Sequence, residues 1–199
     1  MDADHRSNDT DVQRFFHAIG WSENTPEVLD EQQYQAARQA AGNPQQLYHA
    51  DNPAFGASAQ DLARQFFGRD YDFSGTPYRH YISNGYFGGG TYFATTARGS
   101  AGFGTNQFRG FLNNNAKVIT MSRLRSQYDR YANSHPAFAR MMDRVRVGYG
   151  GDGERMSIFA AMLGYNVIHN GMTYYTVLDR KAITVSTQQR RTNRRMADW

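Results

Sequence analysis

The sequence predicts an α+β fold, and three observations support this prediction. Apolar residues at helical spacing, with start and stop signals around them, recur along the first 45 residues. Three β-prone segments follow one another closely between residues 165 and 186. The 199 residues include 13 Tyr and 13 Phe, so aromatic rings must supply much of the core. Because buried tyrosines need hydrogen-bond partners, this composition favours a polar fold with a cleft over a helical bundle.

Helices are expected mainly toward the N-terminus. The apolar residues from Val12 to Ile19 lie at helical spacing, and Gly20 is the expected stop. Thr25-Pro26-Glu27 has the form of an N-cap followed by proline at the first helical position, so a second helix is expected from there to Gly42. Further helices are expected over residues 58–67, 122–131, 137–145 and 152–163.

Strands are expected mainly toward the C-terminus. They are predicted at residues 47–49, 91–96, 116–121, 165–168, 173–178 and 182–186, the last three as a meander-like ending. Residues 69–90 are rich in glycine and aromatic residues without periodicity, which predicts a long loop. We divide the chain into an N-terminal helical extension (1–45), a main domain (46–187) and a basic tail (188–199).

Composition excludes several kinds of site. The chain has no cysteine, which excludes disulfides, thiolate metal sites and cysteine nucleophiles. Its six histidines include no i, i+4 pair, so no metal site is expected. No apolar run approaches about 18 residues, and the first residues lack an apolar segment. We therefore expect no membrane partner, no signal peptide and a cytoplasmic location.

The net charge of +4 is unevenly distributed along the chain. Arginines gather in the tail at positions 190, 191, 194 and 195, and in a second group at positions 123, 125, 130, 140, 144 and 146. Such groups bind nucleic acid or acidic partners in some proteins and are merely solvated in others. The sequence leaves both interpretations open.

One stretch concentrates the functional signals. Gly88-Gly89-Gly90-Thr91-Tyr92-Phe93-Ala94 places glycines directly before an aromatic segment, and Gly99-Ser100-Ala101-Gly102-Phe103 follows it. A glycine run weakens the start of a strand and usually marks a close approach of the backbone, here to a flat ligand. It is not the dinucleotide fingerprint, which follows a strand into a helix. Leu47-Tyr48-His49 lies upstream and Thr173-Tyr174-Tyr175 downstream.

In this order, the motifs resemble those of the ADP-ribosyltransferase superfamily, in the branch whose first two signature residues are His and Tyr. Residues 161–168 and 174–180 are also similar to ADP-ribosyltransferase modules of tailed-phage virion proteins. The resemblance covers residues 46–186. It implies split antiparallel β-sheets around an NAD cleft, with the N-terminal helices beside them. It also implies a transferase with NAD as co-substrate, either cytoplasmic or virion-associated and delivered to the host cytoplasm.

The resemblance assigns the ribose side of the site to the first motif. His49 would bind the nicotinamide-side ribose, although a histidine on a short strand is by itself more often structural. The backbone of Ala50 would hold the nicotinamide amide, at a position where the family commonly has glycine. Gly90, the last of the glycine run, would let the backbone approach NAD closely.

The nicotinamide ring would lie in the second motif. By the same resemblance, Tyr92 and Phe103 would pack on its two faces, and Ser100 would bind its carboxamide. The alternative from the residues alone is that Tyr92 and Phe93 alternate on a core strand and Ser100 caps a helix. That alternative leaves the three glycines before Tyr92 unexplained.

The third signature residue of the family is a glutamate, and here the sequence departs from the pattern. No acidic residue lies between Glu154 and Asp179. Thr173 takes the nearest equivalent position, or Met172 with a shift of one residue, and neither side chain supplies a carboxylate. Because chain elongation in the family is linked to the glutamate, the resemblance implies transfer of a single ADP-ribose. Glu154 either reaches the pocket from a neighbouring element or lies in a first helical turn, where it favours the helix dipole.

Three functions stay open from the sequence. The first is a mono-ADP-ribosyltransferase with His49, Tyr92 and Thr173 as catalytic residues, acting on a protein, such as a host protein, or on nucleic acid held by the basic tail. The second is a catalytically impaired NAD-binding or virion structural module. The third is a basic nucleic-acid-associated protein whose aromatic rings stack on bases.

Overall fold

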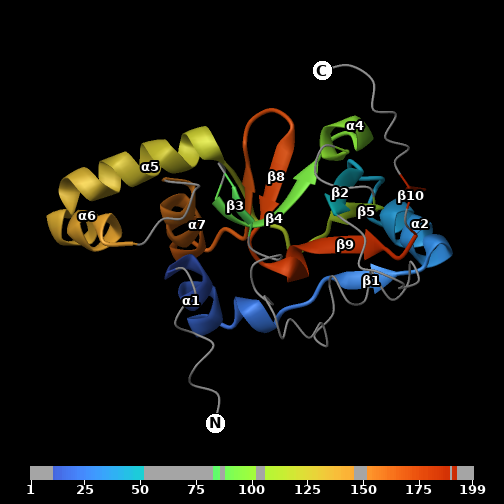
Figure 1. Cartoon of the computed structure of the whole chain (residues 1–199), viewed down its shortest axis with the longest axis horizontal. Coiled ribbons are helices and arrows are strands. Elements are labelled where there is room, and N and C mark those ends of the chain that lie inside the picture. Colours follow the sequence, from blue (N-terminus) through green and yellow to red (C-terminus); the bar gives the residue numbers. More distant parts are fainter. Residues whose placement is uncertain are drawn as a thin grey trace, which may run out of the picture.

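The computed structural model describes residues 11–51, 83–85, 88–101, 106–145, 152–188 and 190–191. These residues form a mixed α/β fold with one large sheet, so the predicted combination of helices and strands is confirmed (Figure 1). The predicted separation of N-terminal helices from C-terminal strands is wrong, because strands and helices alternate along the described chain. The helices are α1 (Asp11–Ala18), α2 (Glu31–Ala40), α4 (Ala97–Ser100), α5 (Met121–Ser134), α6 (Pro136–Asp143) and α7 (Asp152–Met162), with short 3-10 turns η2 (Trp21–Glu23) and η3 (Arg180–Ala182). None of the described helices is long and apolar enough to cross a membrane.

The strands of the sheet come from the whole length of the described chain. They are β1 (Glu27–Leu29), β2 (Leu47–Asp51), β3 (Ser83–Gly85), β4 (Gly88–Ala94), β5 (Asn106–Leu112), β6 (Val118–Thr120), β7 (Val167–His169), β8 (Tyr174–Val177), β9 (Ile183–Ser186) and β10 (Arg190–Arg191). Their order is β1-β9-β5-β2-β4-β8-β7-β6, with β10 paired to β5 and β3 paired to β4.

The expected pair of split antiparallel sheets is therefore one sheet in this structure, and it is not wholly antiparallel. The pairings β1–β9 and β6–β7, at the two ends of the strand order, are parallel. A parallel pair needs a long crossover between its strands, and α5, α6 and α7 supply it between β6 and β7.

The sheet is nevertheless almost divided between β2 and β4. These two strands share a single residue pair, Tyr48 opposite Ala94, whereas β2 pairs with β5 over its whole length. We call the β1-β9-β5-β2 side the first half-sheet and the β4-β8-β7-β6 side the second half-sheet. In Figure 1, β9 and β1 run across the view, whereas β8 stands upright and β4 runs obliquely beside it.

The two half-sheets share a core. It joins Leu47, Phe108, Ile183 and Val185 of the first half-sheet to Phe93, Val167 and Val177 of the second. Cross-strand register places all of these side chains on one face, because residues opposite each other in a ladder point to the same side. One face of the sheet thus packs against itself, and the sheet must bend at the junction of β2 with β4.

A second core lies between the helices and the other face of the second half-sheet. Its buried residues come from the helices α1, α5, α6 and α7 and from the strands beside them, and include Val12, Phe16, Leu124, Met142, Phe159, Ile168 and Leu178. This packing places α1, α5, α6 and α7 together at one side of the molecule (Figure 1). α7 also packs directly on β4, the strand of the glycine run.

Most predicted helices are confirmed, and two of their stop signals have the expected geometry. Gly20 and Gly164 adopt φ values of 77° and 80°, in the left-handed region that favours glycine. The start of the second helix was wrong. Glu27–Leu29 pairs with β9, and α2 begins only after Asp30, which forms a capping box with Gln33. The helix predicted at residues 58–67 lies outside the described residues.

Two strand predictions need correction. The glycine run, placed partly in a long loop, belongs to β4 and pairs with β3. The last three strands do not form a meander, because β9 crosses to the first half-sheet and pairs with β5 and β1. Both edges of the predicted main domain lie within the sheet, since β1 precedes residue 46 and β10 follows residue 187.

A buried polar cluster attaches α2 to the first half-sheet. Arg109 of β5 is 5% exposed and pairs with Glu31, and its Nη2 donates to Gln188 Oε1 over 2.6 Å. Burial raises the pKa of Glu31. Hydrogen bonds from Gln35, Ser186 and Arg109, together with the positive charge of Arg109, outweigh burial, so the pKa of Glu31 lies below its ordinary value. The Arg109 guanidinium also lies 5.7 Å from the ring centre of Tyr34, whose pKa burial raises to about 12.

Candidate functional site

His49 and Tyr92 meet where the ladder between β2 and β4 ends. His49 follows Tyr48, the last residue of β2 paired with β4, and its Nδ1 lies 2.7 Å from the carbonyl oxygen of Tyr92. The imidazole is half-buried, 5.4 Å from the ring of Phe93 and 6.5 Å from that of Phe108. The side chain of His49 thus supplies a cross-strand hydrogen bond in place of the backbone ladder.

This contact fixes the chemistry of the imidazole. A carbonyl oxygen only accepts, so Nδ1 must carry the proton and donate it to Tyr92. In the neutral ring Nε2 is then an acceptor, suited to a hydroxyl donor such as a sugar hydroxyl. The ring is also held in orientation by Phe93 and Phe108, which lowers the entropy lost on ligand binding.

The ring of Tyr92 lies away from the imidazole. Successive side chains of a strand point to opposite faces, and the His49 ring contacts Phe93, so Tyr92 faces the other side of β4. The structure therefore brings His49 to the main chain of Tyr92 and not to its ring. On its own face Tyr92 is half-buried and opposite Thr176 of β8.

Gly90 has a structural reason to be glycine. A Cβ at this position would lie 2.7 Å from the carbonyl oxygen of Val177 and 2.8 Å from Cγ2 of Thr176. Real Cβ atoms do not approach backbone so closely, so β4 and β8 would have to separate. The close backbone approach predicted for the glycine run is thus made to β8.

Ser100 lies in α4 with its hydroxyl already bonded. It is 2% exposed, donates to the carbonyl oxygen of Ala97 over 3.0 Å and accepts from Gln107 Nε2 over 2.6 Å. Gln107 stands opposite Ala50, which is itself 5% exposed, so α4 covers β2 at this point. Because the single hydroxyl proton is committed to Ala97, Ser100 would bind a carboxamide only as an acceptor or after releasing that bond. Phe103, the predicted partner of Tyr92, lies outside the described residues.

Tyr174, and not Thr173, shares the face of Tyr92. Tyr174 opens β8 opposite Ala94, two residues from Tyr92 on the same face of β4. Its hydroxyl donates to the carbonyl oxygen of Gly99 over 3.2 Å and so holds α4. Thr173 precedes the strand with an exposed side chain, and its carbonyl oxygen accepts from the backbone N–H of Thr95.

The remaining candidates for the third position lie elsewhere. Met172 is 80% exposed in the turn before β8. Glu154 is fully buried in the first turn of α7, the helix that packs on β4. A carboxylate therefore lies on an element beside the Tyr92 strand, although β8 itself carries none.

Two residues of this region, Tyr174 and Gln107, were missed as site residues. Tyr174 belongs to a motif singled out in the sequence, but only the register of β4 with β8 distinguishes its face from that of Thr173. Gln107 gave no signal, because its contact with Ser100 depends on β5 lying beside β2.

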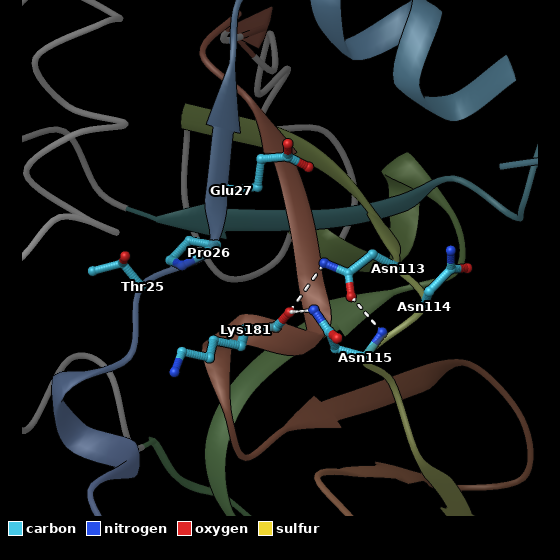
Figure 2. A pocket seen from close by; sticks show the side chains of 7 residues that line it. All are labelled: Thr25, Pro26, Glu27, Asn113, Asn114, Asn115 and Lys181. Carbon is cyan, nitrogen blue, oxygen red and sulfur yellow. Dashed lines mark hydrogen bonds between the residues drawn. The ribbon is translucent and has the colours of Figure 1, made fainter. Parts of the chain in front are cut away.

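The cavity of about 480 Å³ shown in Figure 2 is a different place. It lies between the start of β1, the turn after β5 and η3, and is lined by Thr25, Pro26, Glu27, Asn113, Asn114, Asn115 and Lys181. Asn113 and Asn115 both donate to the carbonyl oxygen of Lys181, and Glu27 accepts from Thr184. Its polar side chains thus mainly hold the turn and the strands together.

No family model, curated protein or solved structure matches this chain. The candidate site therefore stands on its own residues. Within the described parts of the chain, no group of three or more His, Asp or Glu side chains is placed to hold a metal ion.

Proposed function

We propose that this protein binds NAD at the junction of β2 with β4 and transfers a single ADP-ribose to an acceptor, releasing nicotinamide. The observation that carries the proposal is the bond between His49 Nδ1 and the Tyr92 carbonyl. It joins the His and Tyr motifs at the point where the two half-sheets part. Two segments 43 residues apart in sequence meet there with the order of motifs that the resemblance requires.

In this proposal each residue has a separate task. Nε2 of His49 accepts a hydrogen bond from a ribose hydroxyl, since Nδ1 is committed to Tyr92. The ring of Tyr92 faces the other side of β4 from His49, so a bound NAD has to reach both faces at the division between β2 and β4. Packing of that ring on the nicotinamide contributes on the order of 1 kcal/mol beyond burial. Ser100, held by Gln107, accepts from the carboxamide N–H groups.

Loss of the nicotinamide builds positive charge on the ribose, as in glycoside hydrolysis. The face of β4 that carries Tyr92 also carries Tyr174, and β8 supplies no carboxylate to stabilise that charge. A missing electrostatic group of this kind typically lowers the rate by about 10²–10³. We therefore expect slow transfer of single units to a protein or nucleic acid acceptor, and no polymer.

The test is incubation of the purified chain with NAD labelled in its adenine part, together with cell lysate proteins or oligonucleotides. The expected result is release of nicotinamide in step with transfer of label to one acceptor class. His49→Ala should abolish both signals while the fold is retained by circular dichroism. NAD binding with neither signal would contradict transfer, and absence of NAD binding would contradict the whole proposal.

A second candidate function is NAD binding without chemistry, as in a virion structural module. The specific observation in its favour is Tyr174, whose hydroxyl is engaged with Gly99 at the start of β8. Calorimetric titration with NAD separates the two candidates. Binding that is lost in His49→Ala, with no nicotinamide released by the wild-type chain, would support this second function.

A further inference from the structure

Positive charge gathers on the hairpin of α5 and α6. Residues 121–144 carry five Arg side chains against two Asp, a surplus of three positive charges. In Figure 1 this hairpin extends from the second half-sheet at the end of the molecule far from α2. A charged element that projects in this way is accessible to a large partner.

The arginines of the hairpin take part in no ion pair within the described residues. Arg14, Arg109 and Arg155 form ion pairs, and these arginines lie on α1, β5 and α7. The hairpin arginines, at positions 123, 125, 130, 140 and 144, are all exposed. Their charge is therefore not neutralised by the described parts of the chain.

Four of the five arginines lie in two pairs along the helices. Arg123 and Arg130 are two turns apart and so share one side of α5, about 10 Å from each other. Arg140 and Arg144 are one turn apart on the side of α6 opposite the buried Met142. Guanidinium groups bind phosphate oxygens in a bidentate manner, which suits such rows to a phosphate backbone.

An aromatic stack accompanies these charges. The rings of Tyr131 and His135 lie 4.0 Å apart at an interplanar angle of 13°, and Tyr131 is 42% exposed. Tyr131 contacts the edge of Phe138 on α6, which fixes the stack in place. His135 is exposed, and Tyr131 is the ring among the described residues that stacks on its imidazole.

We propose that the α5–α6 hairpin binds single-stranded nucleic acid, with its arginines on phosphates and His135 under a base. The aromatic stack favours this partner over an acidic protein, because an unpaired base offers a flat ring and a carboxylate does not. The contact of Tyr128 and Phe138 with Phe159 of α7 holds the hairpin on the body, so little ordering accompanies binding. This inference is independent of NAD.

The test measures binding of the full chain, without NAD, to an oligothymidylate of about 20 nucleotides, longer than the ~4–16 of a typical single-strand site. Affinity is recorded across a series of salt concentrations. Arg123→Gln/Arg130→Gln should weaken binding and lower the salt slope by about 1.4, at about 0.7 per lost phosphate contact. Arg14→Gln/Lys181→Gln removes the same charge from α1 and η3 and should leave the slope unchanged.

The aromatic contribution needs a second measurement. His135→Ala should weaken binding to the oligothymidylate by about tenfold, the range expected for loss of one stacked base, and leave binding of inorganic polyphosphate unchanged. If Arg123→Gln/Arg130→Gln and Arg14→Gln/Lys181→Gln weakened oligothymidylate binding equally, net charge alone would attract the oligonucleotide. That result would overturn the proposal. Binding of polyphosphate or polyglutamate as tight as that of the oligothymidylate would overturn it as well.

Discussion

The Nδ1 atom of His49 lies 2.7 Å from the carbonyl oxygen of Tyr92, across the one place where the sheet is nearly divided. The bond gives the histidine a structural task at the junction, and the proposed ligand task falls to Nε2, which is buried in this structure. The two tasks can be tested separately, because a substitution can keep a donor at the position of Nδ1 while removing Nε2.

His49→Asn should keep the structural task and lose the ligand task. The asparagine amide can donate to the Tyr92 carbonyl but has no group at the position of Nε2. We expect His49→Ala to lower the free energy of unfolding by about 1 kcal/mol and His49→Asn by less. NAD-dependent nicotinamide release should fall about 10²-fold or more in both variants. Urea denaturation measures the stability of both variants, and a nicotinamide assay measures their activity. Full activity in His49→Asn would show that Nε2 has no role in the reaction.

Gly90→Ala should destabilise the protein by about 1–3 kcal/mol, since the new methyl group must push against the backbone of β8. Gly110→Ala is a graded control. There the new Cβ would meet the carbonyl oxygen of Thr184 at 3.0 Å, so a smaller loss is expected. Urea denaturation measures both losses. Equal stability of Gly90→Ala and the wild type would mean that the glycine run serves only the approach of a ligand.

Tyr174→Phe should weaken the attachment of α4, because it removes the bond to the Gly99 carbonyl. The expected cost is about 1 kcal/mol. Thr173→Val, at the exposed neighbouring position, should change the stability by less than about 0.5 kcal/mol. If the proposed site is correct, nicotinamide release should fall in Tyr174→Phe and persist in Thr173→Val. The reverse order would restore Thr173 as the third site residue.

His169 should make the protein less stable in acid. Its ring stacks on Tyr175 at 4.3 Å, and burial lowers its pKa below the ordinary 6.5. As the pH falls through 6.5, the unfolded chain takes up a proton that the folded chain still refuses, so unfolding becomes easier. His169→Phe keeps the stack and removes the titration. As the pH is lowered from neutral to mildly acidic, the stability of this variant should fall less than that of the wild type. Denaturant titrations at each pH measure the free energy of unfolding of both proteins.

Tyr34 should make the protein less stable in alkali. Burial raises its pKa from 10.0 to about 12, so between these values the unfolded chain loses a proton that the folded chain retains. Stability is therefore lost as the pH rises through that interval. Tyr34→Phe keeps the contact with Phe111 and should show a smaller loss. An alkaline stability profile identical to that of the wild type would mean that the hydroxyl is accessible to solvent.

Local patterns predicted most of the described helices. The spacing of Val12, Phe16 and their neighbours specified α1, and left-handed glycines end α1 and α7 as expected. The proline signal at Thr25-Pro26-Glu27 failed because tertiary pairing of Glu27–Leu29 with β9 overrode it. Asp30, a stronger cap, then begins the helix at Glu31, five residues later than the first helical position that the proline suggested.

The candidate site depended more on tertiary structure. The sequence identified His49, Tyr92, Ser100 and the segment of Thr173 from residue type and order, which are local properties. Their mutual arrangement could not be read from it, since a shift of one residue in strand register moves every side chain to the other face. Register decided that Tyr174 shares the face of Tyr92, and that Gln107 reaches Ser100.

The sequence by itself determined the combination of helices and strands, most of the described helices, the absence of cysteine chemistry and the motifs that raise an NAD-binding hypothesis. Only the tertiary structure decided that the strands form one sheet with a single-pair junction, and that His49 meets the main chain of Tyr92 there. The physical reason is the range of the interactions. Helical spacing and caps act within a few residues, whereas strand order and register depend on pairing between segments far apart in the chain.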